Sequence, residues 1–377
     1  MNVVVITNWP ELEPLKPDWN DLLFRSRASS IFLTWEWMQT WSVVIERRVA
    51  PYVVVVRDNH GKLVGIAPFY QAQLRFLKVF RYRTLRFVAD IATGAEYPDW
   101  IVDPEVEDEV CRAIAGTLVD HRNDWDVIWL PKIAGWTGAL ERLTSSMRGA
   151  GLNVHIRGRE FSAFNLADSL SDYEASLPAK RRQQMRRTSR RVRSIDGVEF
   201  VRCTDLNQLD EFLEALFDLH QRRWQSVGID GAFRRKPVEE AFYREFASVA
   251  LQNGWLGLFG LKQHGVFKAV QFGYIFDRTY HQLQEGFDPD FEQGVGNVLR
   301  HHALDLCMED GVRSYDFLGG WTEHKRRWGA ELRNGHDAFI GGQSLRSRLL
   351  FLREIWPSGR LIEQEGTVTQ IGGLAPE

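Results

Sequence analysis

The chain has 377 residues, with 47 lysines and arginines against 50 aspartates and glutamates, and a formal net charge of −3. Hydrophobic residues make up 44% and charged residues 26%, which excludes a disordered, collagen-like or disulfide-stapled chain. The near-neutral charge argues against a general nucleic-acid binder, and the length predicts two domains. Cys111, Cys203 and Cys307 are too scattered for a disulfide framework or a CxxC site, and they favour a reducing cytoplasm.

The N-terminal half alternates between strands and helices. The apolar run after Met1 predicts a first strand and lacks the basic leader of a secretory signal. Residues 30–48 have apolar side chains at helical spacing and predict an amphipathic helix. Segments 52–58 and 62–70 flank a short Gly-containing turn and predict a β-hairpin. The remaining elements are a strand over 84–90, a helix over 105–121, a strand over 125–130, a helix over 138–150 and a strand over 152–156.

The C-terminal half begins with a helical signal at Ser169 that Pro178 interrupts before the basic run 178–194. Strand 198–203, helices 206–225 and 238–252, strands 255–262, 266–276 and 279–286, helix 296–310, strands 314–318 and 338–340, and a helix over 344–356 follow. The last residues predict a frayed tail. The longest apolar stretches, 51–56 and 254–261, are too short to span a bilayer, so any membrane association would be peripheral.

Both halves show the same order of elements: helical material, an antiparallel meander of three strands, a helix and another strand. We therefore predict an α/β (α+β) fold with two tandem domains, each a mixed, mainly antiparallel sheet flanked by helices. The predicted boundaries are 1–160 and 161–342, with a C-terminal helix and tail over 343–377. No residue repeat of fixed period accompanies this duplication.

The turn Gly294-Val295-Gly296 lies between a predicted strand and a predicted helix. Glycines there let backbone N–H groups at a helix N-terminus face a phosphate, so this turn and Asn297 are candidate cofactor-binding residues. A simple tight turn is the alternative. Leu299 stands where a dinucleotide fingerprint needs glycine, and no GxxxxGK[ST] motif occurs, so P-loop chemistry is not expected.

The second candidate segment follows the predicted strand 314–318, where ligands bind at the carboxyl ends of α/β sheets. Asp316 or Glu323 could serve as a general base, and Lys325 or Arg326 as an anion clamp. The ionisable and aromatic residues gathered after the strand are Trp321, Glu323, His324, Lys325, Arg326 and Trp328. The alternative interpretation is a polar loop with two packing tryptophans.

The third feature is the segment 180–193, which holds eight basic residues and no acidic one. On a helix these positions cover most of the circumference, so a polyanion is the favoured partner and makes Lys180 and Arg181 candidate phosphate-binding residues. A solvated helix is the alternative. Arg223 and Trp224 close another predicted helix and are further candidates for substrate binding.

Several reaction classes lack support in the sequence. No HExxH, GxSxG or cysteine metal spacing is present, and His301 and His302 face different directions on a helix, so we predict no metal site. The arginine-rich helix predicted over 344–356 is expected to dock on the second domain, to lie on an anionic membrane or to bind a phosphorylated regulator.

The second half resembles the CelD-like acetyltransferases of the GNAT superfamily over about residues 165–330. The segments that carry this resemblance are LPAKRRQQMRRTSRR, LFDLHQRRW, FKAVQFGYIFDRTYHQLQEGFDP, GVGNVLRHHAL and YDFLGGWTEHKRRWG. The resemblance implies tandem GNAT-like domains, as in the Fem peptidyltransferases. It also implies direct acyl transfer to an amine, without a covalent enzyme intermediate.

The resemblance assigns roles to particular residues. Gly294 and Gly296 match the small positions of the GNAT pyrophosphate turn Q/R-x-x-G-x-G/A, whereas Phe291 departs from it and keeps aminoacyl-tRNA open as a donor. Lys325 matches the lysine at the active end of Fem-like proteins. Gly319, Gly320 and Trp328 match the closing motif, and Trp321 and Trp328 are expected to stack on a sugar or nucleobase.

Three functions therefore remain open. The favoured one is an acetyl-CoA-dependent N-acetyltransferase acting on an amino-sugar, exopolysaccharide or lipid-linked glycan precursor. The others are a Fem-like aminoacyl-tRNA transferase and a binding protein regulated by cyclic di-GMP. We expect a cytoplasmic protein, with peripheral contact to the inner face of an anionic membrane left open.

Overall fold

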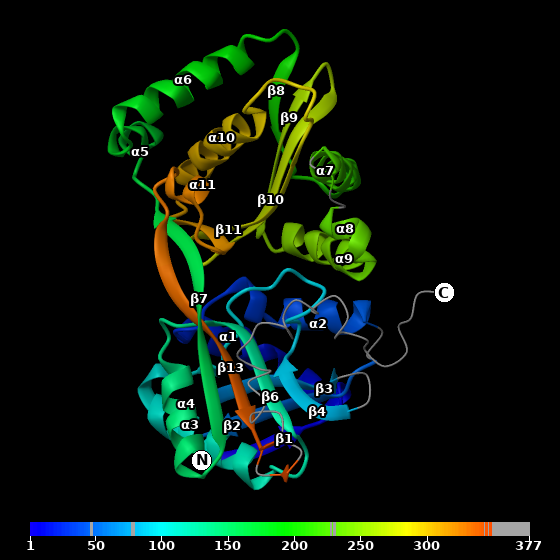
Figure 1. The fold of residues 1–377 in the computed structure, drawn as a ribbon, viewed down its shortest axis with the longest axis vertical. Coiled ribbons are helices and arrows are strands. Elements are labelled where there is room, and N and C mark those ends of the chain that lie inside the picture. Colours follow the sequence, from blue (N-terminus) through cyan, green and yellow to red (C-terminus); the bar gives the residue numbers. More distant parts are fainter. Residues whose placement is uncertain are drawn as a thin grey trace. The chain divides into compact units, whose positions relative to one another are not determined.

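The structure is a computed structural model that describes residues 1–45, 48–76, 80–226, 228, 231–342, 344–345 and 347–348. It divides into two compact units (Figure 1). Unit 1 comprises residues 1–91, 95–159 and the described residues from 334 onward, and unit 2 comprises residues 92–94 and 160–333. Strands β7 (Asn153–Asn165) and β13 (Glu331–Gly341) contribute residues to both units.

Unit 1 contains a sheet in the order β1-β2-β3-β4-β6-β13-β7. The parallel pair β4–β6 sets Thr84 opposite Val127, whereas β1, β2, β3 and β4 pair antiparallel in sequence. The elements are β1 (Asn2–Ile6), α1 (Lys16–Arg25), α2 (Trp35–Val44), β2 (Pro51–Arg57), β3 (Leu63–Phe76), β4 (Phe80–Phe87), β5 (Ile101–Val102), α3 (Glu107–Asp120), β6 (Val127–Ala134) and α4 (Ala139–Gly149), with short 3₁₀ turns at Pro10–Leu15, Ile31–Leu33 and Pro104–Val106.

The helix predicted over 30–48 is shorter than expected. Ser30 and Thr34 are both extended, and their hydroxyls accept the N–H groups of Phe32 and Trp37, so a 3₁₀ turn precedes a helix that starts at Trp35. Helix α1 was not predicted, although Trp19, Leu22 and Leu23 are buried at helical spacing.

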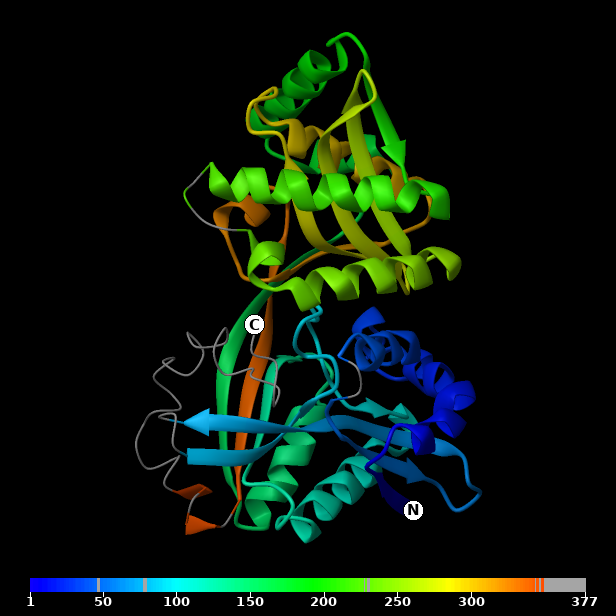
Figure 2. The ribbon, with the colours of Figure 1, turned by 90° about the vertical axis from the view of Figure 1, so that its right-hand side faces the viewer.

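Unit 2 contains a sheet in the order β7-β12-β11-β10-β9-β8. Helix α10 contacts β9, β10 and β11, and α7 contacts β10 and β11. Figures 1 and 2 show α6 and α10 on one face of this sheet and α7 and α9 on the other. The elements are α5 (Leu170–Ser176), α6 (Ala179–Arg193), β8 (Val198–Arg202), α7 (Leu206–Gln225), α8 (Ala232–Arg235), α9 (Pro237–Gln252), β9 (Leu256–Gln263), β10 (Val266–Phe276), β11 (Thr279–Phe287), α10 (Val295–Glu309), β12 (Ser314–Gly319) and α11 (Glu323–Arg326).

This architecture confirms the predicted fold class, because each unit has a mixed, mainly antiparallel sheet flanked by helices. Strands β7 and β13 are much longer than the predicted strands 152–156 and 338–340. Residues 334–341, which we placed with the second domain, lie in unit 1 because this part of β13 pairs with β6.

Two further sequence expectations concern the C-terminus and the membrane. The predicted helix 344–356 and the tail lie almost wholly outside the described residues. Among the helices that the structure describes, none is both long and apolar enough to cross a membrane.

Candidate active site

The candidate site in unit 2 lies where strands β11 and β12 separate. They run parallel, and across the described residues 279–319 their pairing ends at His281 and Asp316. Strand β12 then shifts its register against β7 between Asp316 and Gly319. Because both strands point their carboxyl ends the same way, this separation opens the sheet at the edge where α/β proteins bind ligands.

Arg300, on α10, lies at the centre of a polar cluster at this separation and is only 2% exposed. Its guanidinium forms an ion pair with Glu285 of β11 and a 2.9 Å hydrogen bond to Nε2 of His324 on α11. Arg223 of α7 binds the other oxygen of Glu285 at 2.9 Å. One buried cation thus connects a strand and two helices.

Two neutral side chains extend the cluster toward β12. The Tyr315 hydroxyl donates to Gln282 Oε1 at 2.8 Å, and the Gln282 amide donates to Glu285 at 3.2 Å. The Arg300 guanidinium also lies 5.4 Å from the Phe317 ring centroid and 5.1 Å from that of Trp328, within the range of cation–π attraction.

Burial and the neighbouring charges determine the protonation states of Glu285 and His324. Burial raises the pKa of Glu285, but the charges of Arg300 and Arg223 outweigh this and hold the pKa below its usual value. Burial and the Arg300 charge both lower the pKa of His324. Near neutral pH, Glu285 is therefore a carboxylate and His324 is an uncharged imidazole.

Asp316, a predicted general base, is 1% exposed and has a local structural role. Its Oδ1 accepts the N–H of Leu318 at 2.7 Å, and Leu318 adopts a left-handed φ of 61°. Its Oδ2 lies 3.6 Å from Arg333 and 4.0 Å from His281. Asp316 thus supports the register shift of β12, because its carboxylate stabilises a backbone conformation that leucine rarely adopts.

Lys325, the second predicted catalytic residue, is bound to the loop that follows β12. Its ammonium donates to the carbonyl oxygens of Phe317, Gly319 and Gly320. An ammonium has three N–H donors, and these contacts occupy all three. The third candidate, Glu323, pairs with Arg326 and Arg327, and its side chain is 53% exposed.

Substituting Lys325 by methionine is expected to lower the free energy of unfolding by about 1–3 kcal/mol, because three backbone carbonyls lose a charged donor. Urea denaturation followed by tryptophan fluorescence measures this loss. Arg326→Met is the control, because the exposed ion pair of Arg326 with Glu323 is worth about 0.5 kcal/mol or less. Equal losses in the two variants would contradict a special role of Lys325 in the loop.

The predicted aromatic stacking residues have different environments. Trp328 is completely buried and lies under Arg181, with its carbonyl accepting the Tyr173 hydroxyl at 3.0 Å. This burial leaves Trp328 no face for a sugar or a nucleobase, contrary to our expectation. Trp321 is partly buried at the edge of the core, and Trp224 donates its indole N–H to His220 at 3.0 Å.

The first turn of α10 has the geometry expected of an anion site. Gly294 is the N-cap residue with a φ of 86°, and as a glycine it supplies no side-chain cap. A Cβ atom on Gly296 would lie 3.2 Å from the Phe287 ring, so a side chain there would require the ring to shift by a few tenths of an ångström. Asn297 follows in the same turn and is partly buried. Val295 donates its N–H to the Glu292 carbonyl at 3.1 Å, so the N–H groups of Gly296 and Asn297, together with the helix dipole, are the ones that favour a bound phosphate.

The basic helix α6 lies directly beside this turn. Arg191 donates to the Gln293 carbonyl at 3.1 Å and pairs with Glu292 at 2.8 Å. A Cβ atom on Gly294 would lie 3.2 Å from a Thr188 methyl group. The structure thus brings together two features that are about 100 residues apart in the sequence.

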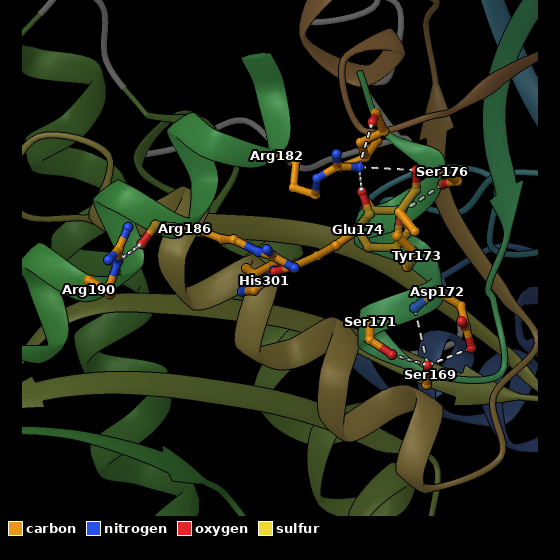
Figure 3. A network of polar contacts seen from close by, with 12 residues as sticks. Ser169, Ser171, Asp172, Tyr173, Glu174, Ser176, Arg182, Arg186, Arg190 and His301 are labelled. Atoms are coloured by element: carbon orange, nitrogen blue, oxygen red, sulfur yellow. Dashed lines mark hydrogen bonds and ion pairs between the residues drawn. The ribbon is translucent and has the colours of Figure 1, made fainter. Parts of the chain in front are cut away.

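Much of the positive charge of α6 is used in packing, as Figure 3 shows. Arg182 donates to the carbonyl oxygens of Glu174, Ala175 and Leu177 at the end of α5. Arg186 binds the buried Glu174 carboxylate at 2.6 Å, and His301 of α10 contacts its other oxygen at 2.9 Å. These contacts connect α5, α6 and α10.

The outer surface of α6 retains free cations. Lys180, Arg187 and Arg190 are exposed, and within the described part of the chain none of them has an acidic partner. The buried face consists of Met185, Ser189 and Val192. The predicted basic helix is therefore two-sided, because Arg181, Arg182 and Arg186 face packed elements while other cations face solvent.

Comparison with known proteins agrees with this arrangement. Residues 179–326 match the family described as "Acetyltransferase (GNAT) domain". The matched segment contains α6 and the first turn of α10. It also contains every polar residue of the cluster around Arg300, and of the aromatic rings described there only Trp328 lies beyond it. The protein is an acyltransferase. No curated protein matches the sequence.

Two solved structures of low sequence identity share the fold, and a third gives a weaker match. A structure described as FemX is 12% identical over 94% of this chain and 100% of its own, with a TM-score of 0.64. A conserved protein of unknown function from Bacteroides thetaiotaomicron VPI-5482 is 12% identical over 87% of this chain and 97% of its own, with a TM-score of 0.55. A tandem GNAT protein from the clavulanic acid biosynthesis pathway is 14% identical over 90% and 98%, with a TM-score of 0.46.

A metal centre finds no support in the part of the chain that the structure describes. No group of three or more His, Cys, Asp or Glu side chains there could hold a metal ion. His301 binds Glu174 and His302 lies 4.5 Å from the Phe200 ring, so the adjacent histidines serve different contacts.

Proposed function

We propose that the protein is a CelD-like N-acetyltransferase that transfers an acetyl group from acetyl-CoA to an amino group of an amino-sugar, exopolysaccharide or other cell-envelope precursor. The observation that carries this proposal is the uncapped first turn of α10 at Gly294, within the GNAT domain and beside the cations of α6. The pyrophosphate of acetyl-CoA would bind this turn, with Gly294, Gly296 and Asn297 around it.

The cations beside the turn support a donor with several phosphate groups. Arg187 and Arg190 have no acidic partner among the described residues and lie on the same helix as Thr188, which contacts the turn. Acyl-CoA carries a pyrophosphate and a further phosphate, so local positive charge would strengthen its binding. Because acetyl-CoA is a cytoplasmic metabolite, this donor also favours a cytoplasmic location.

The proposed reaction is direct transfer in a ternary complex. The acceptor nitrogen attacks the thioester carbonyl, a base removes a proton from that nitrogen, and the CoA thiolate leaves when the tetrahedral intermediate collapses. Of the two predicted catalytic carboxylates, that of Glu323 is the more exposed, and Glu323 is our candidate base. Asp316 and Lys325 would instead shape the loop next to it.

Thermal-shift measurement with acetyl-CoA, total tRNA and cyclic di-GMP tests the donor. A ligand that binds only the folded state raises the melting temperature by mass action, and we expect acetyl-CoA to produce the largest rise. A salt-sensitive rise with tRNA and none with acetyl-CoA would replace this proposal by an aminoacyl-tRNA transferase. A rise with cyclic di-GMP alone would indicate a regulatory binding protein.

Gly294→Ala is expected to weaken acetyl-CoA binding about tenfold or more, because a Cβ atom at a φ of 86° shifts the turn and misaligns its N–H groups. Isothermal titration calorimetry measures the affinity. Gly311→Ala is the matched control: Gly311 has a φ of 76° just beyond the other end of α10, and a Cβ atom there meets nothing within 4 Å. If both variants bind acetyl-CoA equally well, the turn does not hold the donor.

A further inference from the structure

The hydrogen bond between Arg300 and His324 determines which ring nitrogen of His324 carries the proton. Arginine has only N–H donors and no acceptor, so Nε2 of His324 must accept at the 2.9 Å contact with Arg300 Nη1. The single proton of the neutral ring is therefore on Nδ1. Arg300 cannot rotate away easily, because it is buried and also bound to Glu285.

This arrangement makes His324 a neutral hydrogen-bond donor instead of a base. Its basic nitrogen, Nε2, is occupied by Arg300, and Nδ1 already carries the proton. The positive charge of Arg300 polarises the ring and strengthens the Nδ1–H donor. His324 is exposed to solvent, whereas its partner Arg300 is buried.

His324 also lies at the right place in unit 2 for contact with a donor. It belongs to α11, which directly follows β12 beyond its separation from β11. It is hydrogen-bonded to Arg300 of α10. Arg300 lies six residues after Gly294, which begins the first turn of α10 and with it the proposed pyrophosphate site. The acyl group of acyl-CoA is separated from the pyrophosphate by the pantetheine arm, so it must lie some distance from that turn.

We propose that His324 donates its Nδ1–H to the acyl carbonyl oxygen of the donor and that Arg300 is the positioning residue that holds this tautomer. The inference rests on the proposed acetyl-CoA-dependent function. When the acceptor nitrogen bonds to the carbonyl carbon, negative charge develops on the oxygen and the hydrogen bond strengthens. The C–S bond then breaks, the thiolate leaves with its electron pair, and His324 neither gains nor loses a proton.

The test compares two ligands that differ in the carbonyl group. Acetyl-CoA carries the oxygen, and S-ethyl-CoA has the same length without it. One neutral hydrogen bond is worth roughly three- to tenfold in affinity, so the wild-type protein should bind acetyl-CoA tighter by that factor. In His324→Ala the ratio should fall to about one, with the affinity for S-ethyl-CoA unchanged. His324→Gln retains an N–H donor and should keep much of the preference.

The control is His264→Ala, because His264 is an exposed histidine of the same unit that lies 3.8 Å from the exposed Asp196. It should leave the ratio at the wild-type value. A wild-type protein that binds both ligands equally, or a His324→Ala variant that keeps the preference, would overturn the inference alone. If the wild-type protein binds neither ligand, the proposed function itself fails.

Nitrogen-15 NMR of histidine-labelled protein tests the geometric premise without any ligand. We expect the His324 ring to show the Nδ1–H tautomer at pH 7, and Arg300→Lys to weaken or abolish that preference. A melting curve of Arg300→Lys establishes whether the variant is folded. An Nε2–H tautomer in the wild-type protein would overturn the proposal, whatever the affinities show.

Discussion

Replacing Asp99 by asparagine is expected to stabilise the protein at pH 8 and to leave its stability at pH 4 nearly unchanged. Asp99 is completely buried in unit 1, where its carboxyl accepts the Thr137 hydroxyl at 2.6 Å and the Trp100 N–H at 2.8 Å. Burial is the largest influence and raises its pKa to about 7, and the nearby carboxylates of Glu141 and Glu107 act in the same direction. The protonated side chain is therefore the form that the fold prefers.

The direction of the pH effect follows from linkage. An unfolded chain ionises Asp99 near pH 4, whereas the folded protein keeps it protonated until about pH 7. Between these values folding takes up a proton, so the contribution of Asp99 to stability falls as the pH rises and is fully lost above about pH 7. A difference of three pKa units corresponds to at most about 4 kcal/mol, and we expect a gain on the order of 2–4 kcal/mol for Asp99→Asn at pH 8.

Urea denaturation of both proteins at pH 4, 6 and 8 measures this effect. Asp108→Asn is the control, because the Asp108 side chain is 77% exposed and pairs with Arg142 at the surface. The gap between Asp99→Asn and the wild-type protein should widen with pH, whereas the control should show no such trend. A constant gap at all three pH values would mean that Asp99 ionises normally in the fold.

Thr137, the partner of Asp99, belongs to a Gly-Trp-Thr sequence that occurs once in each unit. Thr137 ends the triplet Gly135-Trp136-Thr137 after β6, and Gly320-Trp321-Thr322 follows β12. Both triplets follow a strand that pairs parallel with its neighbour, β4 in one unit and β11 in the other. The same residues thus recur at the same structural position, although their threonines have different partners.

Most elements of the fold were predictable, because their apolar residues recur at helical or strand spacing. The extensions of β7 and β13 were not. Arg157, Arg159 and Glu160 interrupt the apolar pattern of β7, and only the pairing of distant strands shows that these polar residues belong to a strand. Whether such a segment forms a strand depends on pairing and burial by distant parts of the chain, which the local sequence pattern does not show.

The segments that form the candidate site were predicted, but the contacts between their residues were not. The Gly294 turn, the segment after β12 and the basic helix were all recognised, yet Glu285 and Arg300 were not among the candidates. Their pairing joins different elements and is settled only when the strands are placed. One local signal did exist: Arg300 stands on the buried face of α10 beside Val298 and Leu299, and a charge on an apolar helix face must find a partner.

Substituting Asp337 should cause the second large effect on stability. Asp337 is 1% exposed within β13, and its carboxylate binds Arg157 at 2.7 Å and Arg159 at 2.7 Å. It also accepts the N–H of Lys132, which has a left-handed φ of 63°. One buried carboxylate therefore serves two cations and a strained backbone position of β6.

We expect Asp337→Asn to lower the free energy of unfolding by about 2–3 kcal/mol at pH 7, because two guanidiniums lose a buried counter-charge. Asp337→Ala should cost more, since it also removes the acceptor for Lys132. Burial raises the pKa of Asp337, but the hydrogen bond and charge of Arg159 outweigh this and hold the pKa below its usual value. The stabilisation by Asp337 is thus complete above about pH 4 and is lost as the pH falls through the folded pKa.

Urea denaturation at pH 7 and at pH 3 separates the two contributions of Asp337. The difference between the wild-type protein and Asp337→Asn should shrink at the lower pH, where the wild-type carboxylate begins to protonate. Asp18→Asn is the control, because Asp18 is 55% exposed and lies 3.7 Å from Arg57, so its loss should cost about 0.5 kcal/mol or less. If Asp337→Asn costs no more than this control at pH 7, the two arginines are held by β7 itself and the carboxylate between them adds nothing to the pairing.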